Sequence, residues 1–155
     1  MKASLRSRNG TLQGLVASRP NGFCPGADCA TLNSMDQILI ALAGVMGAAG
    51  IMLTAAGAHS KPGVGLDSAG YLLVLHALAV IAGVLAARQG LILRPLGLIV
   101  VWGFIVGATL FAADVTLRAY VGTRLFPMAA PSGGMVMILS WIVLIPAALM
   151  AMRAG

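Results

Sequence analysis

Long apolar runs alternate with short polar segments over most of this chain. The runs cover residues 38–58, 69–87, 96–113 and 135–152, and none of them contains a charged residue. A helix needs roughly 17 to 25 such residues to cross about 30 Å of hydrocarbon, whereas a barrel strand is shorter. The pattern therefore predicts an all-α fold, an integral membrane bundle of four transmembrane helices over about residues 38–58, 69–87, 96–117 and 135–152.

The composition also favours a membrane protein. Of the 155 residues, 59% are hydrophobic and 9% are charged, and the mean hydropathy is +0.96. A soluble domain carries about 25% charged residues. The 10 basic and 4 acidic side chains are too few to cover a globule of this size in water. These values argue against a soluble enzyme and against a secreted disulfide scaffold, and they make the lipid bilayer the expected surroundings.

The first 34 residues differ from the rest because they are polar, lack a periodic pattern and contain several glycines and prolines. We interpret residues 1–34 as a disordered tail or as the product of a mis-assigned start codon, and residues 35–155 as the transmembrane domain. This segment holds four of the 10 basic residues and one of the 4 acidic residues, so the formal net charge of +6 falls to +3 without it. The net charge therefore gives no reason to expect nucleic-acid binding.

Both cysteines also lie in this first segment, within the sequence CPGADC from Cys24 to Cys29. The spacing would permit a small disulfide loop or two thiolate ligands to a metal. Two thiolates without a second pair of ligands make no closed zinc site, and no histidine is nearby. We therefore expect neither a metal nor a cofactor.

Lysine and arginine in the short loops indicate which side of the membrane is cytoplasmic. The side with both chain ends carries Arg88, Arg94 and Arg153, and the opposite side carries Lys61, Arg118 and Arg124. Although the count is balanced, Arg118 can still belong to a helix, and residues 1–34 would add four basic residues to the terminal side. We expect both termini to be cytoplasmic.

Small residues recur within the predicted spans at spacings that let helices approach closely. Gly103 and Gly107 form a GxxxG pair in the third span, and Gly47 and Gly83 belong to similar patterns in the first and second spans. In lipid, close van der Waals packing takes the place of the hydrophobic effect between helices. We predict that these four glycines lie at helix–helix contacts. Pro146 lacks a backbone donor, so we also predict a kink in the fourth helix.

Few polar groups lie at membrane depth, and a function within the bilayer would depend on them. His76 lies inside the second span, Tyr71 lies near its start, and His59 closes the first span. Because the connection between these spans is short, the two histidines could come together to bind haem or metal, or to relay protons. We favour a hydrogen-bonded packing role for His76, since His59 lies near the membrane surface.

Asp114 and Arg118 are four residues apart, a spacing that places both side chains on one face of a helix. In a partly desolvated site the two charges can neutralise each other. We interpret the pair as structural, with a proton relay as the alternative. Further on, Ser132 could cap the fourth helix, and Gly133 and Gly134 could either form a turn or cradle an anion at the positive end of that helix.

Several separated motifs follow one another in the order found in a known family. They are GAH at residues 57–59, Tyr71 with LHAL at 75–78, GATLF at 107–111, and FPMAAPSGG at 126–134 followed by Trp141. In these motifs, residues 35–153 resemble the small four-helix membrane family called domain of unknown function 423, which includes YgdD-like inner-membrane proteins of bacteria. Asp114 and Arg118 depart from the family pattern, which has a small or hydroxyl residue and an apolar residue there. The resemblance implies this topology and a bacterial inner-membrane location, but it implies no activity.

The chain contains no nucleophilic triad, carboxylate pair, phosphate-binding loop or metal signature that would indicate an enzyme. Our leading hypothesis is a structural or accessory membrane protein that acts through helix contacts, with itself as a homo-oligomer or with a larger membrane complex. The alternative is a small transporter or channel with a polar path around His59, His76 and Asp114. Because four helices leave little room for a pore, that alternative would need an oligomer.

Overall fold

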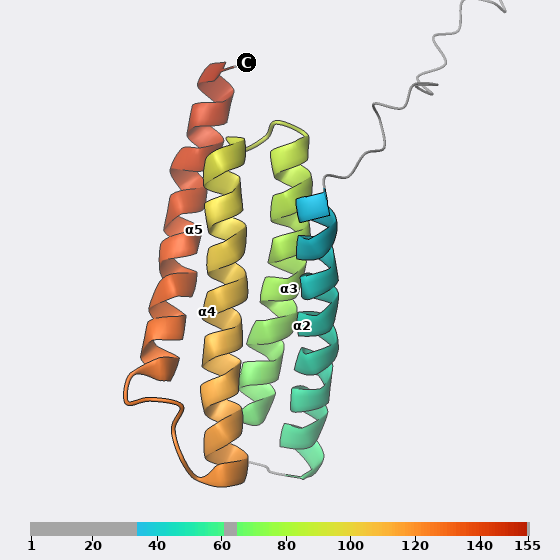
Figure 1. The fold of residues 1–155 in the computed structure, drawn as a ribbon, viewed down its shortest axis with the longest axis vertical. Helices are drawn as coiled ribbons and strands as arrows, with labels where there is room; N and C mark the ends of the chain where they lie inside the picture. Colours follow the sequence, from blue (N-terminus) through green and yellow to red (C-terminus); the bar gives the residue numbers. More distant parts are fainter. Residues whose placement is uncertain (1–33, 61–64, 155) are drawn as a thin grey trace, which may run out of the picture. The chain divides into compact units, whose positions relative to one another are not determined.

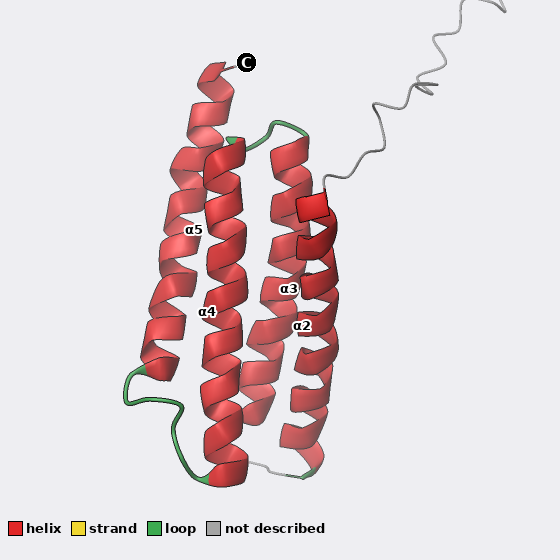
Figure 2. Cartoon of the chain, in the orientation of Figure 1, coloured by secondary structure: helices red, strands yellow, loops and turns green. Residues whose placement is uncertain are grey.

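The computed structural model describes residues 34–60 and 65–154, and nearly all of them are helical (Figures 1 and 2). The helices are α2 (Ser34–His59), α3 (Leu66–Arg88), α4 (Arg94–Val121) and α5 (Ala129–Ala154). All four are long and apolar enough to cross a membrane, and the described residues contain no strand. The predicted all-α fold with four membrane-spanning helices is therefore confirmed. The interpretation of residues 1–34, with both cysteines, falls almost wholly outside the described residues.

Each helix is longer than the apolar run that predicted it. α4 extends past residue 113 to Val121, and α5 begins at Ala129 rather than near residue 135. Pro131 is compatible with this early start, because proline fits the first turn of a helix, where no backbone N–H is needed for a helical bond. Apolar runs mark only the part of a helix that lies in hydrocarbon. Charged and polar residues continue the helices beyond it.

Helices that follow one another along the chain are neighbours in space, and each runs opposite to the next (Figure 1). α3 packs against both α2 and α4, and α2 also touches α4. The backbone of α5 comes close to α4 but to no other described helix. The start of α2 and the end of α5 consequently lie at one end of the bundle, which we call the terminal end. The opposite end holds the α2–α3 and α4–α5 connections.

The hydrophobic core lies mainly between α2, α3 and α4. Its buried members include Leu39, Ala43 and Met46 from α2, Leu73, Ala77, Val80 and Val84 from α3, and Val100, Val101, Phe104 and Ala108 from α4, with Met137 from α5. On the other side of the helices, large apolar side chains such as Ile51, Leu78 and Ile145 are exposed. An outward apolar surface is what a bundle surrounded by lipid chains requires.

α2 and α3 approach closely at two glycines, Gly50 and Gly70, that are not among the four named above. A Cβ atom added to Gly50 would lie 2.8 Å from the carbonyl oxygen of Gly70, and one added to Gly70 would lie 2.6 Å from the carbonyl oxygen of Gly50. Real Cβ contacts are longer than this, so any side chain at either position would separate the helices. The two helices therefore touch backbone to backbone at this level.

The four glycines selected from the sequence differ in how closely they are packed. Gly107 faces Gly133 and Met137 of α5, Gly103 faces the Ser140 side chain of α5, and Gly83 faces Val101 of α4. Gly47 has only an ordinary contact, 3.9 Å from an added Cβ to the Cβ of Ala77. The α4–α5 contact thus uses the glycine pair four residues apart, together with Gly133 from the opposite helix.

α5 continues through Pro146 as one helix. Next to this proline, the carbonyl oxygen of Ala147 accepts a hydrogen bond of 3.0 Å from the backbone N–H of Leu93, in the α3–α4 connection. Ala147 is itself fully buried. This main-chain bond holds the last part of α5 against the terminal end of the bundle.

Candidate functional site

The buried polar side chains in the described part of the chain are Asp36, His76, Asp114 and Ser140. They lie at three levels: Asp36 at the terminal end, His76 and Ser140 inside the bundle, and Asp114 toward the opposite end. Each of the three levels has its own hydrogen-bonding partners.

At the terminal end, one carboxylate joins three helices. Oδ2 of Asp36, in the first turn of α2, lies 2.8 Å from Nε of Arg88 at the end of α3 and 3.6 Å from a guanidinium nitrogen of Arg94 at the start of α4. The Asp36 side chain is 4% exposed. The sequence analysis missed this cluster, because Asp36 precedes the first apolar run and its partners are distant in sequence.

Inside the bundle, His76 is 3% exposed and both of its ring nitrogens have partners. Nδ1 lies 2.8 Å from the carbonyl oxygen of Leu72, and the indole Nε1 of Trp141 donates to Nε2 at 3.4 Å. A carbonyl can only accept and an indole N–H can only donate. The two partners therefore select the neutral tautomer with its proton on Nδ1.

Aromatic rings enclose the same histidine. The imidazole and the Phe104 ring meet edge to face with centroids 5.3 Å apart, and the rings of Phe104 and Trp141 are 4.8 Å apart. This cluster brings side chains of α3, α4 and α5 together. The arrangement fits the packing role that we favoured for His76. The described residues include no group of three or more His, Cys, Asp or Glu side chains that could hold a metal ion.

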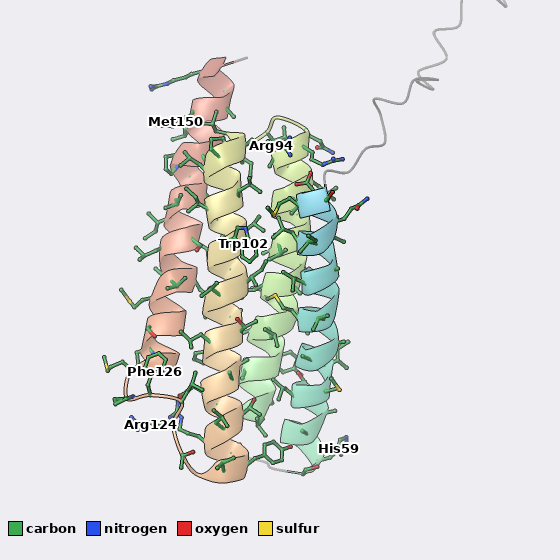
Figure 3. The ribbon with its side chains drawn as sticks, viewed as in Figure 1. His59, Arg94, Trp102, Arg124, Phe126 and Met150 are labelled. Atoms are coloured by element: carbon green, nitrogen blue, oxygen red, sulfur yellow. The ribbon has the colours of Figure 1, made fainter. Side chains whose placement is uncertain are left out.

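His59 and Tyr71 do not join His76. His59 is exposed at the end of α2 (Figure 3), and Tyr71 is 66% exposed on the outside of α3. His76 is the eleventh residue of α3, which places it about 15 Å from the start of that helix at 1.5 Å per residue. The structure consequently brings the two histidines to different surroundings, one at the bundle end and one in the core.

Toward the end opposite the termini, Asp114 of α4 uses both carboxylate oxygens. Oδ2 accepts a bond of 2.7 Å from Arg118, and Oδ1 accepts a bond of 3.0 Å from the backbone N–H of Leu125. The aspartate is 2% exposed, while the arginine side chain is 42% exposed. The pair on one helix face thus exists as the spacing predicted. The bond to Leu125 shows that Asp114 also fixes the α4–α5 connection, which the sequence analysis missed.

A cavity of about 460 Å³ lies beside this ion pair. Charged and proline residues make up much of its wall: Asp114, Arg118, Arg124, Pro127 and Pro131. Arg124 comes from the connection between α4 and α5, at the same end of the bundle as His59 but on the opposite edge (Figure 3). Three charged side chains, Asp114, Arg118 and Arg124, line this cavity.

Ser132 does not cap α5. The helix begins three residues earlier, and the Ser132 hydroxyl donates to the carbonyl oxygen of Ala129 at 2.9 Å. A capping hydroxyl lies just before the helix and accepts a bond from a backbone N–H instead. The capping prediction is wrong because the helix continues into a segment whose prolines and glycines indicate a turn. Gly133 packs against α4, and Gly134 lines the charged cavity.

Four further hydroxyls of the bundle bond within their own helices. Thr54, Thr109, Thr116 and Ser140 each bond to the carbonyl oxygen four residues earlier. No buried side-chain nitrogen or oxygen of the described residues lacks a hydrogen-bond partner. The polar side chains inside the bundle therefore stabilise it without presenting a free group to a ligand.

Comparisons of the chain with protein-family models, with curated proteins and with solved structures found no match.

Proposed function

We propose that this chain is an accessory integral membrane protein of a bacterial inner membrane that binds a helix of a larger membrane complex. The proposal includes cytoplasmic termini and membership of the four-helix family that the sequence motifs resemble. It assigns the chain no catalysis, because each buried polar side chain of the described residues already has a hydrogen-bonding partner. The surface that would bind the partner lies on the outside of α2.

The observation that carries this proposal is a row of small residues exposed on α2. Ala41, Gly44, Ala48 and Ala55 are all exposed, and three of them repeat at intervals of seven residues. A Cβ atom added to Gly44 would meet nothing within 4 Å. We call these four residues the α2 outer face. Rows of small residues on membrane helices let another helix approach closely, and a seven-residue repeat fits the left-handed crossing common in membrane bundles.

Most helical glycines of this protein already contact a neighbouring helix, as Gly50, Gly70 and Gly107 do. Gly44 and Gly134 are the described helical glycines with open space beside them, and Gly134 lines the charged cavity. The α2 outer face is therefore a packing surface without an internal partner. Ala55 also borders an apolar groove of about 590 Å³ between α2 and α3. A helix lying on this face would cover part of that groove.

The transporter hypothesis receives less support from the geometry. Asp114 lies ten residues beyond Phe104 on α4, and Phe104 is the residue that contacts His76. Ten residues of helix correspond to about 15 Å, and the buried residues of α4 in this interval are glycine and apolar residues: Ile105, Gly107, Ala108 and Ala112. A polar path would also have to break hydrogen bonds that are already formed at both groups.

The test places a photo-crosslinking amino acid at Ala48 in cells, followed by purification of the full chain in mild detergent. The same amino acid at Ala82, an exposed alanine of α3, is the matched control. We expect Ala48 to crosslink to one subunit of a larger complex and Ala82 not to. The double variant Gly44→Leu with Ala48→Leu should abolish co-purification of that complex, and Ala82→Leu should not.

Two results would overturn the proposal. If Ala48 crosslinks only to a second copy of this chain, the face is a homo-oligomer contact and the accessory role fails. If the complex co-purifies equally with the double leucine variant and with Ala82→Leu, the α2 outer face does not bind it. Thermal unfolding of each variant shows whether the leucines also disturb the fold.

A further inference from the structure

The charged cavity at the end of α4 has the features of an anion site. We propose that it binds a phosphate group and that a membrane phospholipid supplies this group. The site is separate from the α2 outer face, so its test does not depend on the proposed function.

The charged side chains that line the cavity carry a net positive charge. Asp114 lines the cavity, but both of its oxygens are occupied by Arg118 and by the Leu125 backbone. Arg118 balances this carboxylate and uses one of its nitrogens in the bond to it. Arg124 has no hydrogen bond or ion pair with any residue that the structure describes. The three side chains together leave one positive charge facing the cavity.

The arrangement of the two arginines in the cavity also suits a phosphate group. A guanidinium has five N–H donors in a plane, so Arg118 keeps donors free for a second acceptor while it holds Asp114. Asp114 positions the neighbouring arginine as well, because its bond to the N–H of Leu125 fixes the residue next to Arg124. Two guanidinium groups converging on one hollow are a common way to bind phosphate.

The beginning of α5 also forms part of the cavity. Ala130 and Pro131, in its first turn, belong to the cavity wall. The N-terminal end of a helix carries a partial positive charge, which adds to the attraction for an anion. The helix end alone would not define a site, but here it lies in the same cavity as both arginines. A volume of about 460 Å³ is large enough for a phosphate with its glycerol.

We infer that the cavity lies at the membrane surface. α4 has 28 residues and is therefore about 42 Å long, which exceeds the roughly 30 Å of the hydrocarbon layer. In the connection that follows, Leu125, Phe126 and Met128 are 46%, 42% and 63% exposed. Exposed leucine and phenylalanine side chains beside arginines are typical of segments that lie at the headgroup boundary. Lipid phosphates lie at this level, and we therefore infer the lipid as the source.

The test measures binding of phosphatidylglycerol to the purified full chain by native mass spectrometry during a lipid titration. Replacement of Arg124 by glutamine removes the unpaired charge without touching Asp114. We expect Arg124→Gln to weaken binding about tenfold, which is the usual effect of losing one charge-assisted hydrogen bond. Arg124→Lys should keep the charge but lose the planar arrangement of N–H donors. Its affinity for the lipid should therefore lie between those of the wild-type chain and Arg124→Gln.

Arg153→Gln is the matched control, because Arg153 is an exposed arginine at the terminal end of α5. An equal loss in Arg153→Gln and Arg124→Gln would show that only surface charge attracts the lipid, and the proposal would be wrong. Equal binding of diacylglycerol, which lacks phosphate, would also overturn it. Circular dichroism of the variants verifies that they remain folded.

A last pair of measurements identifies the source of the phosphate. If the lipid is the source, glycerol 3-phosphate at millimolar concentration should not displace phosphatidylglycerol. If glycerol 3-phosphate alone binds with the same dependence on Arg124, the cavity recognises phosphate but takes it from a soluble compound. In that case the inference of a lipid source is wrong, while phosphate binding stands.

Discussion

At the scale of single residues, the ionic groups of this bundle connect segments that apolar packing leaves apart. Asp36 ties α2 to the ends of α3 and α4, and Asp114 ties α4 to the connection before α5. Each carboxylate is buried and each partner arginine is partly exposed. Near the membrane surface this division is favourable, since the arginine head can reach water while its carboxylate partner stays paired.

The variant Asp36→Asn should destabilise the protein, because two guanidinium groups would lose their anionic partner. We expect the free energy of unfolding to fall by about 1 kcal/mol, toward the low end for bonds to charged groups, since the arginines are partly solvated. The measurement is unfolding in mixed micelles at increasing dodecyl sulfate. Asp67→Asn, at an exposed position of α3, is the control and should change little. Equal losses in the two variants would contradict a structural role for the cluster.

The two ionic sites also show what a sequence can and cannot predict about side chains. Asp114 and Arg118 are four residues apart, so helix geometry alone predicts their pairing. Asp36 and Arg88 are separated by 52 residues, and only the folded arrangement of helices brings them together. The same holds for Trp141 and His76, 65 residues apart. Local pairs were predictable, whereas pairs between helices required the structure.

At the scale of helices, apolar runs identified all four elements, but not their ends or their contact faces. The runs depend on hydropathy, which changes sharply at the hydrocarbon boundary, while the helix backbone continues past it. For the contact faces, each span contains several small residues, and their spacing does not show which of them meets a neighbour. Gly50 and Gly70 form a tight α2–α3 contact, although Gly47 has an equally suitable spacing. The choice depends on the rotation of each helix, which follows from packing against all neighbours at once.

Substitution of Gly70 by alanine should separate α2 from α3. The added Cβ would overlap the backbone of Gly50 and Thr54, and we expect a loss of about 1 to 3 kcal/mol, the usual cost of overpacking. Gly44→Ala is the matched control on α2, where the new methyl group meets open space. Helix propensity should make that variant neutral or slightly stabilising. The measurement is again unfolding in mixed micelles, and equal effects of the two alanines would contradict the backbone contact.

At the scale of the whole bundle, the four helices run in alternating directions, so the start of α2 and the end of α5 share one side of a membrane (Figure 1). Which side this is depends on the basic residues near each end. Arg88, Arg94 and Arg153 lie at the terminal end, with Arg118 and Arg124 at the other. The structure pairs two arginines at the terminal end and one at the other end with buried aspartates, so the count of basic residues remains a weak guide to orientation.

Single cysteines should report this topology in a background where Cys24 and Cys29 are replaced by serine. We expect Gln89→Cys and Met152→Cys to be labelled by an impermeant maleimide only from the cytoplasmic side. Ser60→Cys and Thr123→Cys, both at exposed positions, should be labelled only from the opposite side. Labelling of Gln89→Cys and Met152→Cys on different sides would contradict four spans, and a fully inverted pattern would contradict cytoplasmic termini.

The linear order of neighbours also bears on biosynthesis. α2 pairs with α3, α3 with α4 and α4 with α5, so nearly every backbone contact joins a helix to the one made just before it. Contacts between successive elements have short loop closures, and they favour rapid assembly. The first three helices can therefore form their shared core while the ribosome is still completing the fourth. α5 then docks as a last step, guided by Trp141, Gly133 and the main-chain bond from Leu93.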